Sequence, residues 1–173
     1  MVLPALAGAR DVRRPRVPNR PRATTPTGGG GGGCSDPIQG VWVSRRYRAD
    51  FRRWDVFTLT IRRTAPGAET LTGTIEMRNW HGAISQTTPA CTGDFPRDIT
   101  WDQTARGTLS GDHFTFDGTS VRVRELRCGF LTTYHLDHFE GTLDAARHVI
   151  TTTNDDHFAE VGVPHEFTRV RCL

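Results

Sequence analysis

A chain of 173 residues has the length of one domain, and an apolar fraction of 36% with abundant Thr and Gly favours β-strands and turns over helices. The net charge of +3 is unevenly placed, because residues 1–33 carry six arginines against one aspartate and hold +5. Residues 34–173 therefore carry −2, the difference between these two values. A body this close to neutral does not require a nucleic-acid partner. The sequence also lacks the roughly 20 consecutive apolar residues of a membrane-spanning helix.

The first 33 residues differ in composition from the rest of the chain. They are rich in Arg and Pro and end in six consecutive glycines at 28–33. Such a segment buries too little apolar surface to offset the entropy of ordering, so we expect residues 1–33 to be a disordered arm and linker. Residues 34–173 then form the folded domain. The first nine residues lack the basic start of a signal peptide.

From residue 34 onward the apolar residues alternate with polar ones, as in half-buried strands. The first strand begins at Gly40-Val41-Trp42, and short turns such as Ser110-Gly111-Asp112 separate the following ones. The segment 131–143 is expected to be one long strand. The later strand-like segments are 54–63, 70–78, 99–102, 121–127, 131–143, 148–153 and 167–171, and 108–116 is expected to be a hairpin centred on its Ser-Gly-Asp turn.

Eight or nine short strands without helical crossovers predict sequential antiparallel pairing. Such a meander protects its edges best by closing. We therefore predict an all-β fold with a single antiparallel up-and-down β-barrel of about eight strands. A β-sandwich is the alternative.

The four cysteines, Cys34, Cys91, Cys128 and Cys172, have no C-x-x-C spacing, which disfavours a zinc ribbon. Three disulfide connectivities are possible, as are four free thiols in a cytoplasmic protein. In a closed meander the first and last strands are neighbours, so we favour Cys34–Cys172 and Cys91–Cys128. Two disulfides would suit an extracellular or periplasmic protein.

Gly40-Val41-Trp42 in the first strand, with Arg169 or Arg171 in the last, resembles the calycin superfamily of lipocalins, fatty-acid-binding proteins and avidins. The resemblance implies that Trp42 packs under one of these two arginines at the closed end of the barrel. A guanidinium over an indole gains cation–π attraction. The resemblance supplies this structural pair and no ligand.

Candidate ligand contacts concentrate in residues 45–54, where five arginines accompany three aromatic residues. We expect this segment to form the first loop between strands, at the mouth of the barrel, which guards the ligand entrance in lipocalin-like barrels. Further aromatic surface comes from later strands, although most aromatic residues of a barrel belong to its core. The candidates are Tyr47, Phe51, Trp54, Trp80, Trp101 and Phe116.

A catalytic alternative rests on the polar cluster at residues 134–140. On a regular strand Tyr134, His138 and Glu140 share one face and could act as acid–base groups of an isomerase, cyclase or hydratase. The run 154–157, Asn-Asp-Asp-His, is better explained as a turn than as a calcium loop. The sequence contains no nucleophile elbow, phosphate loop or dinucleotide fingerprint, and we expect neither a cofactor nor a metal.

Three functions remain open. The leading one is binding of a hydrophobic or amphipathic small molecule inside the barrel, with entry past residues 45–54. The second is an enzyme in the same barrel, and the third is an interaction module with a solid barrel. A binding protein should hold a cavity of roughly 300 Å³ or more. The oligomeric state is left open.

Overall fold

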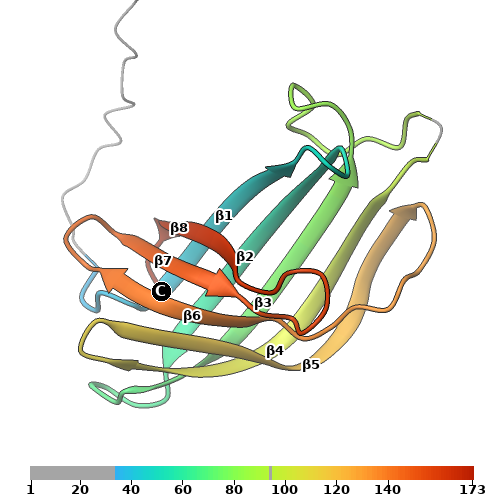
Figure 1. Cartoon of the computed structure of the whole chain (residues 1–173). Helices are drawn as coiled ribbons and strands as arrows, with labels where there is room; N and C mark the ends of the chain where they lie inside the picture. The colour runs from blue at the N-terminus through green and yellow to red at the C-terminus, as the bar shows by residue number, and fades with distance from the viewer. Residues whose placement is uncertain (1–33, 94) are drawn as a thin grey trace, which may run out of the picture. The chain divides into compact units, whose positions relative to one another are not determined.

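The computed structural model describes residues 34–93 and 95–173, and the predicted arm at 1–33 lies outside them. The described residues form eight antiparallel strands, each paired with the next, and the last pairs with the first to close a barrel (Figure 1). This part of the chain contains no helix. The predicted all-β barrel is therefore confirmed. The strands are β1 (Gly40–Arg48), β2 (Arg53–Arg63), β3 (Thr70–His81), β4 (Asp98–Ser110), β5 (His113–Cys128), β6 (His138–Asp144), β7 (Val149–Asn154) and β8 (Val163–Arg171).

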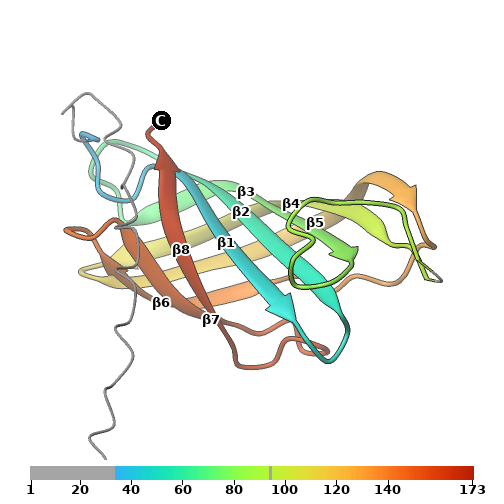
Figure 2. The ribbon, with the colours of Figure 1, turned by 90° about the horizontal axis from the view of Figure 1, so that it is seen from above.

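The two terminal strands meet as neighbours, and Figure 2 shows β8 alongside β1. Trp42 lies opposite Arg169 in the ladder, with the guanidinium carbon 5.3 Å from the centre of the indole. Arg169 also donates to the carbonyl oxygens of Asp36 and Pro37, at 3.1 and 2.9 Å. Arg169 is therefore the partner of Trp42, whereas Arg171 is exposed at the end of the strand.

Both favoured disulfides are present. Cys34–Cys172 joins the segment before β1 to the end of β8, with Cα atoms 5.6 Å apart. Cys91–Cys128 joins the loop between β3 and β4 to the end of β5, with Cα atoms 5.9 Å apart. The first disulfide reinforces closure of the barrel, and the second anchors a long loop at the opposite end.

The half of the barrel near Trp42 is packed solid. Its inward side chains come from every strand and are fully buried, and aromatic rings meet edge to face at its centre. Phe139 touches Phe57 and Phe167 in this way, with ring centres 5.3 and 5.2 Å apart. Gly107 allows close packing of the wall, because a Cβ there would lie 1.9 Å from the carbonyl oxygen of Thr115.

The barrel opens at its other end because two pairs of strands separate. Pairing between β1 and β8 is confined to 41–43 and 168–171, and β6 pairs with β5 only as far as Asp117. Beyond that point β5 follows β4, and three register shifts bend this pair away from β6 (Figure 1). The loops 49–52, 82–97, 129–137 and 155–162 surround the open end.

The predicted long strand at 131–143 is wrong in its first half. The strand β6 begins only at His138, and residues 130–137 form a loop. The separation of β5 from β6 leaves these residues without a partner strand. Tyr134 and Asp137 instead turn their side chains into the open end of the barrel.

Candidate functional site

A pocket of about 310 Å³ lies in the open end of the barrel, above the solid core. Each of the four loops around the opening supplies part of its wall, and the strands supply Met77, Asn79 and Trp101 below. The wall combines apolar rings with charged groups. The loop residues and strand ends in contact with the pocket include Phe51, Arg53, Arg97, Tyr134, Asp137, Phe158 and Glu160.

Two stacked rings form one side of the pocket. Tyr134, from the loop between β5 and β6, stacks on Trp101 of β4 with ring centres 4.6 Å apart. Arg97 lies over the same indole, its guanidinium carbon 5.5 Å from the ring centre. The loop residue Tyr134 is thus held in place by contact with a strand, and its ring provides an ordered apolar surface for a ligand.

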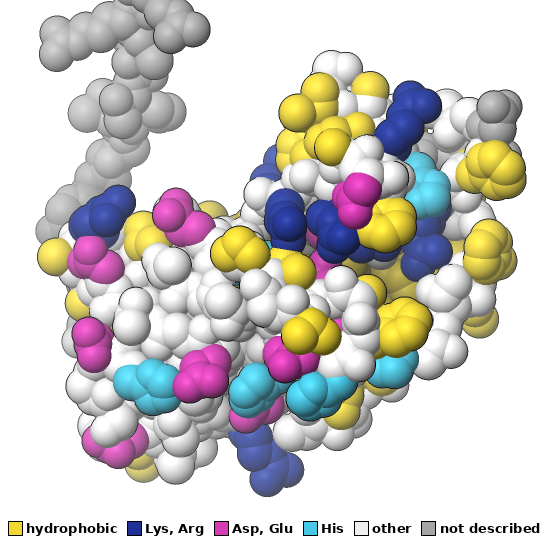
Figure 3. All heavy atoms as spheres, viewed as in Figure 1, with side chains coloured by type: hydrophobic (Ala, Val, Ile, Leu, Met, Phe, Trp, Pro, Cys, Tyr) yellow, Lys and Arg dark blue, Asp and Glu magenta, His cyan; other side chains and the backbone are white. Residues whose placement is uncertain are grey.

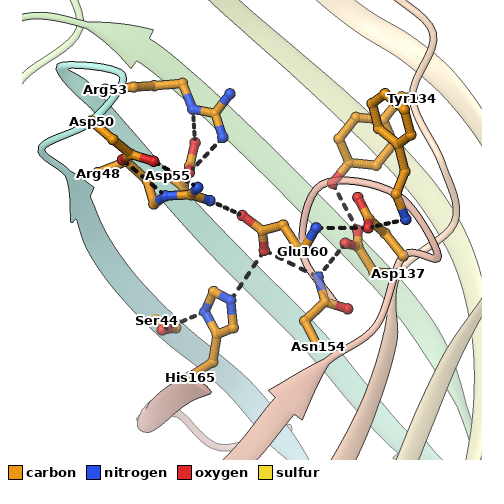
Figure 4. Close-up of polar contacts among 12 residues, drawn as sticks. Ser44, Arg48, Asp50, Arg53, Asp55, Tyr134, Asp137, Asn154, Glu160 and His165 are labelled. Atoms are coloured by element: carbon orange, nitrogen blue, oxygen red, sulfur yellow. Dashed lines mark hydrogen bonds and ion pairs between the residues drawn. The ribbon is translucent and has the colours of Figure 1, made fainter. Parts of the chain in front are cut away.

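The carboxylate of Asp137 is the centre of a buried hydrogen-bond network (Figure 4). It accepts hydrogen bonds from the hydroxyl of Tyr134, at 2.7 Å, and from the side-chain amides of Asn154, at 2.6 Å, and Gln103. Burial raises the pKa of Asp137 to about 7, although these three bonds oppose the rise. Burial and the neighbouring Asp137 charge also raise the pKa of Tyr134 well above its ordinary value.

Glu160 continues this network toward β8. Its carboxylate accepts from Asn154 and contacts Nε2 of His165, both at 3.2 Å, and pairs with Arg48 at 3.4 Å. Burial acts to raise the pKa of Glu160, but the hydrogen bonds of His165 and Asn154 and the charges of His165 and Arg53 together lower it. The opposite nitrogen of His165 lies 3.4 Å from the hydroxyl of Ser44. These contacts bridge the ends of β1 and β8 where their backbones no longer pair.

The Ser44, His165 and Glu160 side chains form a chain of contacts like that of a hydrolytic triad. All three are buried, and the His165 ring is packed edge to face against Phe57, with ring centres 4.9 Å apart. Ser44 and His165 also line a shallow depression between β1 and β8, but each residue is only 4% exposed there. The three residues therefore hold the wall together.

The second charged pair of the open end is Arg53 with Asp55. The guanidinium donates to the carboxylate at 2.9 Å, and Asp55 is buried. Burial raises the pKa of Asp55, while the charge and hydrogen bond of Arg53 oppose the rise. The charge of Arg53 that faces the pocket is thus largely compensated from within the protein.

The structure divides the predicted ligand contacts into three groups. Phe51 and Trp101 line the pocket, whereas Phe116 is fully buried in the solid core. The remaining three lie on the outer wall, where they stack across β1, β2 and β3 and hold the loop after β3. These are Tyr47, Trp54 and Trp80, which donate to the carbonyl oxygens of Gly82, Ala83 and Gln86 at 3.2, 3.3 and 3.1 Å.

The predicted acid–base residues do not share one site. Tyr134 lies in the pocket and bonds to Asp137, whereas His138 and Glu140 lie on the outer wall with side chains 42% and 57% exposed. His138 pairs there with Asp117, and Glu140 contacts His113 at 3.6 Å. The cause is the loop at 130–137, which removes the regular alternation that would place the three on one face.

Asp137, Arg97, Glu160 and His165 were not among the predicted site residues. A signal for His165 was present, because it shares an inward face with the core residue Phe167. The other three lie in loops or at strand ends, where alternation gives no direction for a side chain.

The predicted turn at 154–157 begins one residue later, because Asn154 is the last residue of β7 and the loop begins at Asp155. Asp155 accepts from the backbone N–H of His157, and Asp156 accepts from those of Phe158 and Glu160, each at 2.8 Å. Within the described part of the chain, no group of three or more His, Cys, Asp or Glu side chains could hold a metal ion. None of the described segments is a helix of the length and hydropathy needed to cross a membrane.

Large apolar side chains surround the pocket on the surface. Figure 3 shows them gathered around the open end, and they come from all four loops. The most exposed aromatic residues there are Phe95, Phe158, Phe130 and Phe51, at 82%, 73%, 71% and 53%. Exposed apolar patches on soluble proteins are often sites of interaction.

Comparison with known proteins gives no family to which the chain can be assigned. No protein-family model, no curated protein and no solved structure matches it. The functional argument therefore rests on the geometry of the open end.

Proposed function

We propose that this protein binds a small amphipathic molecule in the pocket at the open end of its barrel, as calycin-like binding proteins do. The observation that carries this proposal is the pocket itself. Its volume of about 310 Å³ lies at the lower end of the range of ligand sites, roughly 300–1,000 Å³. Its wall joins Trp101 and Phe158 to a small number of charged groups, which is the usual composition of such sites.

Binding explains the polar network better than catalysis does. Asp137 and Glu160 each accept several bonds from neighbouring side chains, and these bonds connect loops to strands. Carboxylates held by three side chains each fix the shape of a site, and a general base would in addition need a lone pair within reach of the substrate. An extracellular or periplasmic location is part of the same proposal and is supported by the two disulfides.

Native mass spectrometry of protein purified from its own host tests the proposal. We expect a non-covalent adduct on the wild-type chain. Ala159→Trp, which fills the pocket, should abolish the adduct, and Ala146→Trp, an exposed position at the closed end, should keep it. Absence of an adduct from the wild type, together with no hit at this pocket in a ligand-observed NMR fragment screen, would contradict the proposal.

A further inference from the structure

One arginine of the pocket has only neutral hydrogen-bond partners among the residues that the structure describes. Arg97 donates from Nε to the amide oxygen of Asn79, at 2.7 Å, and from Nη2 to the hydroxyl of Thr132, at 3.1 Å. Within residues 34–93 and 95–173, no carboxylate lies within ion-pair distance of Arg97. A guanidinium carries five N–H groups, so these two bonds leave donors for another acceptor.

The surroundings of Arg97 disfavour its positively charged form. Burial, followed by the positive charge of nearby Arg53, lowers the pKa of Arg97. Arg53 has its own carboxylate in Asp55, whereas Arg97 is half-buried and stacked over Trp101. A partly buried cation of this kind is stabilised by an anion that enters the same space.

The acidic groups of the pocket do not supply that anion. The Asp137 carboxylate is turned to Tyr134, Gln103 and Asn154, and the Glu160 carboxylate is turned to Asn154, His165 and Arg48. The third acidic side chain of the pocket, Asp156, accepts from the backbone N–H groups of Phe158 and Glu160. Apolar side chains make up much of the remaining wall, namely Met77, Trp101, Phe158 and Ala159, with Phe51 at the rim. Among the described residues, the site thus offers one arginine without a carboxylate partner beside an apolar surface.

We propose that the pocket binds an amphipathic anion, a small carboxylate with an aromatic or short aliphatic body, and that Arg97 receives the carboxylate. This inference rests on the proposed binding function and specifies its ligand class. The planar guanidinium matches a carboxylate in geometry, and the fixed bonds to Asn79 and Thr132 hold it ready for two parallel hydrogen bonds. The apolar body of the ligand would lie against Trp101 and Phe158.

A matched pair of probes separates the charge from the apolar body. 2-Naphthoate is the anion, and 2-naphthalenemethanol is the neutral compound of nearly the same shape. Isothermal titration calorimetry with the wild-type protein at pH 8 should show roughly tenfold or greater preference for the anion, the size of effect that a charge-assisted hydrogen bond produces. Added NaCl should weaken naphthoate binding and leave the alcohol unchanged.

Three substitutions at two positions complete the test. Arg97→Gln should reduce the preference to within about threefold, whereas Arg97→Lys should retain part of it. Arg106→Gln removes an equal charge from the exposed outer face of β4 and should leave both affinities unchanged. Thermal melting of each variant confirms that it is folded. If a variant does not fold, the salt dependence of the wild-type protein still tests the proposal.

The outcomes distinguish the two proposals. Equal affinity of wild type for the two probes, or equal loss in Arg97→Gln and Arg106→Gln, would overturn the anion site while leaving a binding pocket. Failure of both probes to bind wild type at millimolar concentration, together with failure of the adduct experiment, would overturn the binding function as well.

Discussion

The hydroxyl of Tyr134 donates a 2.7 Å hydrogen bond to the buried carboxylate of Asp137, three residues later in the same loop between β5 and β6. The same carboxylate accepts from Asn154, the last residue of β7. One ionisable group therefore holds both a pocket wall and the end of a strand. Its ionisation must affect the stability of the open end.

We predict that the free energy of unfolding falls as pH rises from about 5 to about 7. An unfolded Asp carboxyl has a pKa near 3.8, and the folded pKa of Asp137 is about 7. Between these values the folded state holds a proton that the unfolded state releases, so a rise in pH favours unfolding by at most about 1.4 kcal/mol per unit. Above pH 7 this contribution is constant.

Urea unfolding at several pH values measures this slope. Histidines titrate in the same range, so the informative quantity is the difference between wild type and Asp137→Asn, which should lose the contribution of this carboxyl. The pKa of Glu160 is lowered, so its stabilisation is lost at pH values below about 4.5, outside the measured window. Identical slopes in the two proteins would contradict the prediction.

The closed end of the barrel gives a second prediction. Arg169→Gln removes the contact with Trp42 and weakens the bonds to the carbonyl oxygens of Asp36 and Pro37. We expect a loss of about 1–3 kcal/mol in the free energy of unfolding, since cation–π contacts and charged hydrogen bonds each contribute on that scale. Arg171→Gln, two residues away and exposed, should change it by less than about 0.5 kcal/mol. Equal effects of the two substitutions would show that Trp42 and Arg169 do not close the barrel as a pair.

The disulfides give a third prediction, because they close loops of different length at opposite ends. Cys34 and Cys172 are separated by 138 positions, and Cys91 and Cys128 by 37. The chain-entropy relation gives losses of about 5 and 4 kcal/mol for the respective double Ala variants. The free energies of unfolding of the two double variants should therefore differ by only about 1 kcal/mol. Limited proteolysis distinguishes them better, because only Cys91→Ala/Cys128→Ala should expose the loop 82–97 to cleavage. Equal protease sensitivity of that loop in both variants would contradict this assignment.

Much of the fold was readable from the sequence because closure and alternation leave local signals. The turn at Gly111-Asp112, the pairing of the first and last strands and both disulfides follow from a meander that closes on itself. The loop at 130–137 was not readable. Its polar and apolar residues alternate as in a strand, and only the bending of β5 away from β6 removes the partner.

The position of the open end also had a sequence signal, which becomes clear once the inward faces of the strands are known. On four strands, two successive inward positions hold an apolar residue and then a polar one. In all four cases the polar residue lies nearer the open end of the barrel. The pairs are Trp42 and Ser44, Phe57 and Asp55, Met77 and Asn79, and Phe167 and His165. The same alternation places Trp54 beside Val56 on the outer face, where the structure has it. The loop residues Arg97 and Asp137 had no such signal, because their direction depends on tertiary contacts.

The division of the barrel into a solid half and an open half leads to a fourth prediction, in which stability and binding separate. Phe139 is fully buried between Phe57 and Phe167, so Phe139→Ala should cost about 3–5 kcal/mol of stability through the cavity it leaves. Phe158 is exposed at the rim and lines the pocket, so Phe158→Ala should change stability by less than about 0.5 kcal/mol.

The same two variants should behave in the opposite way toward a ligand. Phe158→Ala removes an apolar wall of the pocket and should weaken 2-naphthoate about tenfold, whereas Phe139→Ala, where folded, should bind it within about threefold of wild type. Urea unfolding and calorimetry on the same preparations measure both quantities. If Phe139→Ala instead abolished binding while still folded, the ligand would lie in the core half of the barrel, and the pocket at the open end would be only its entrance.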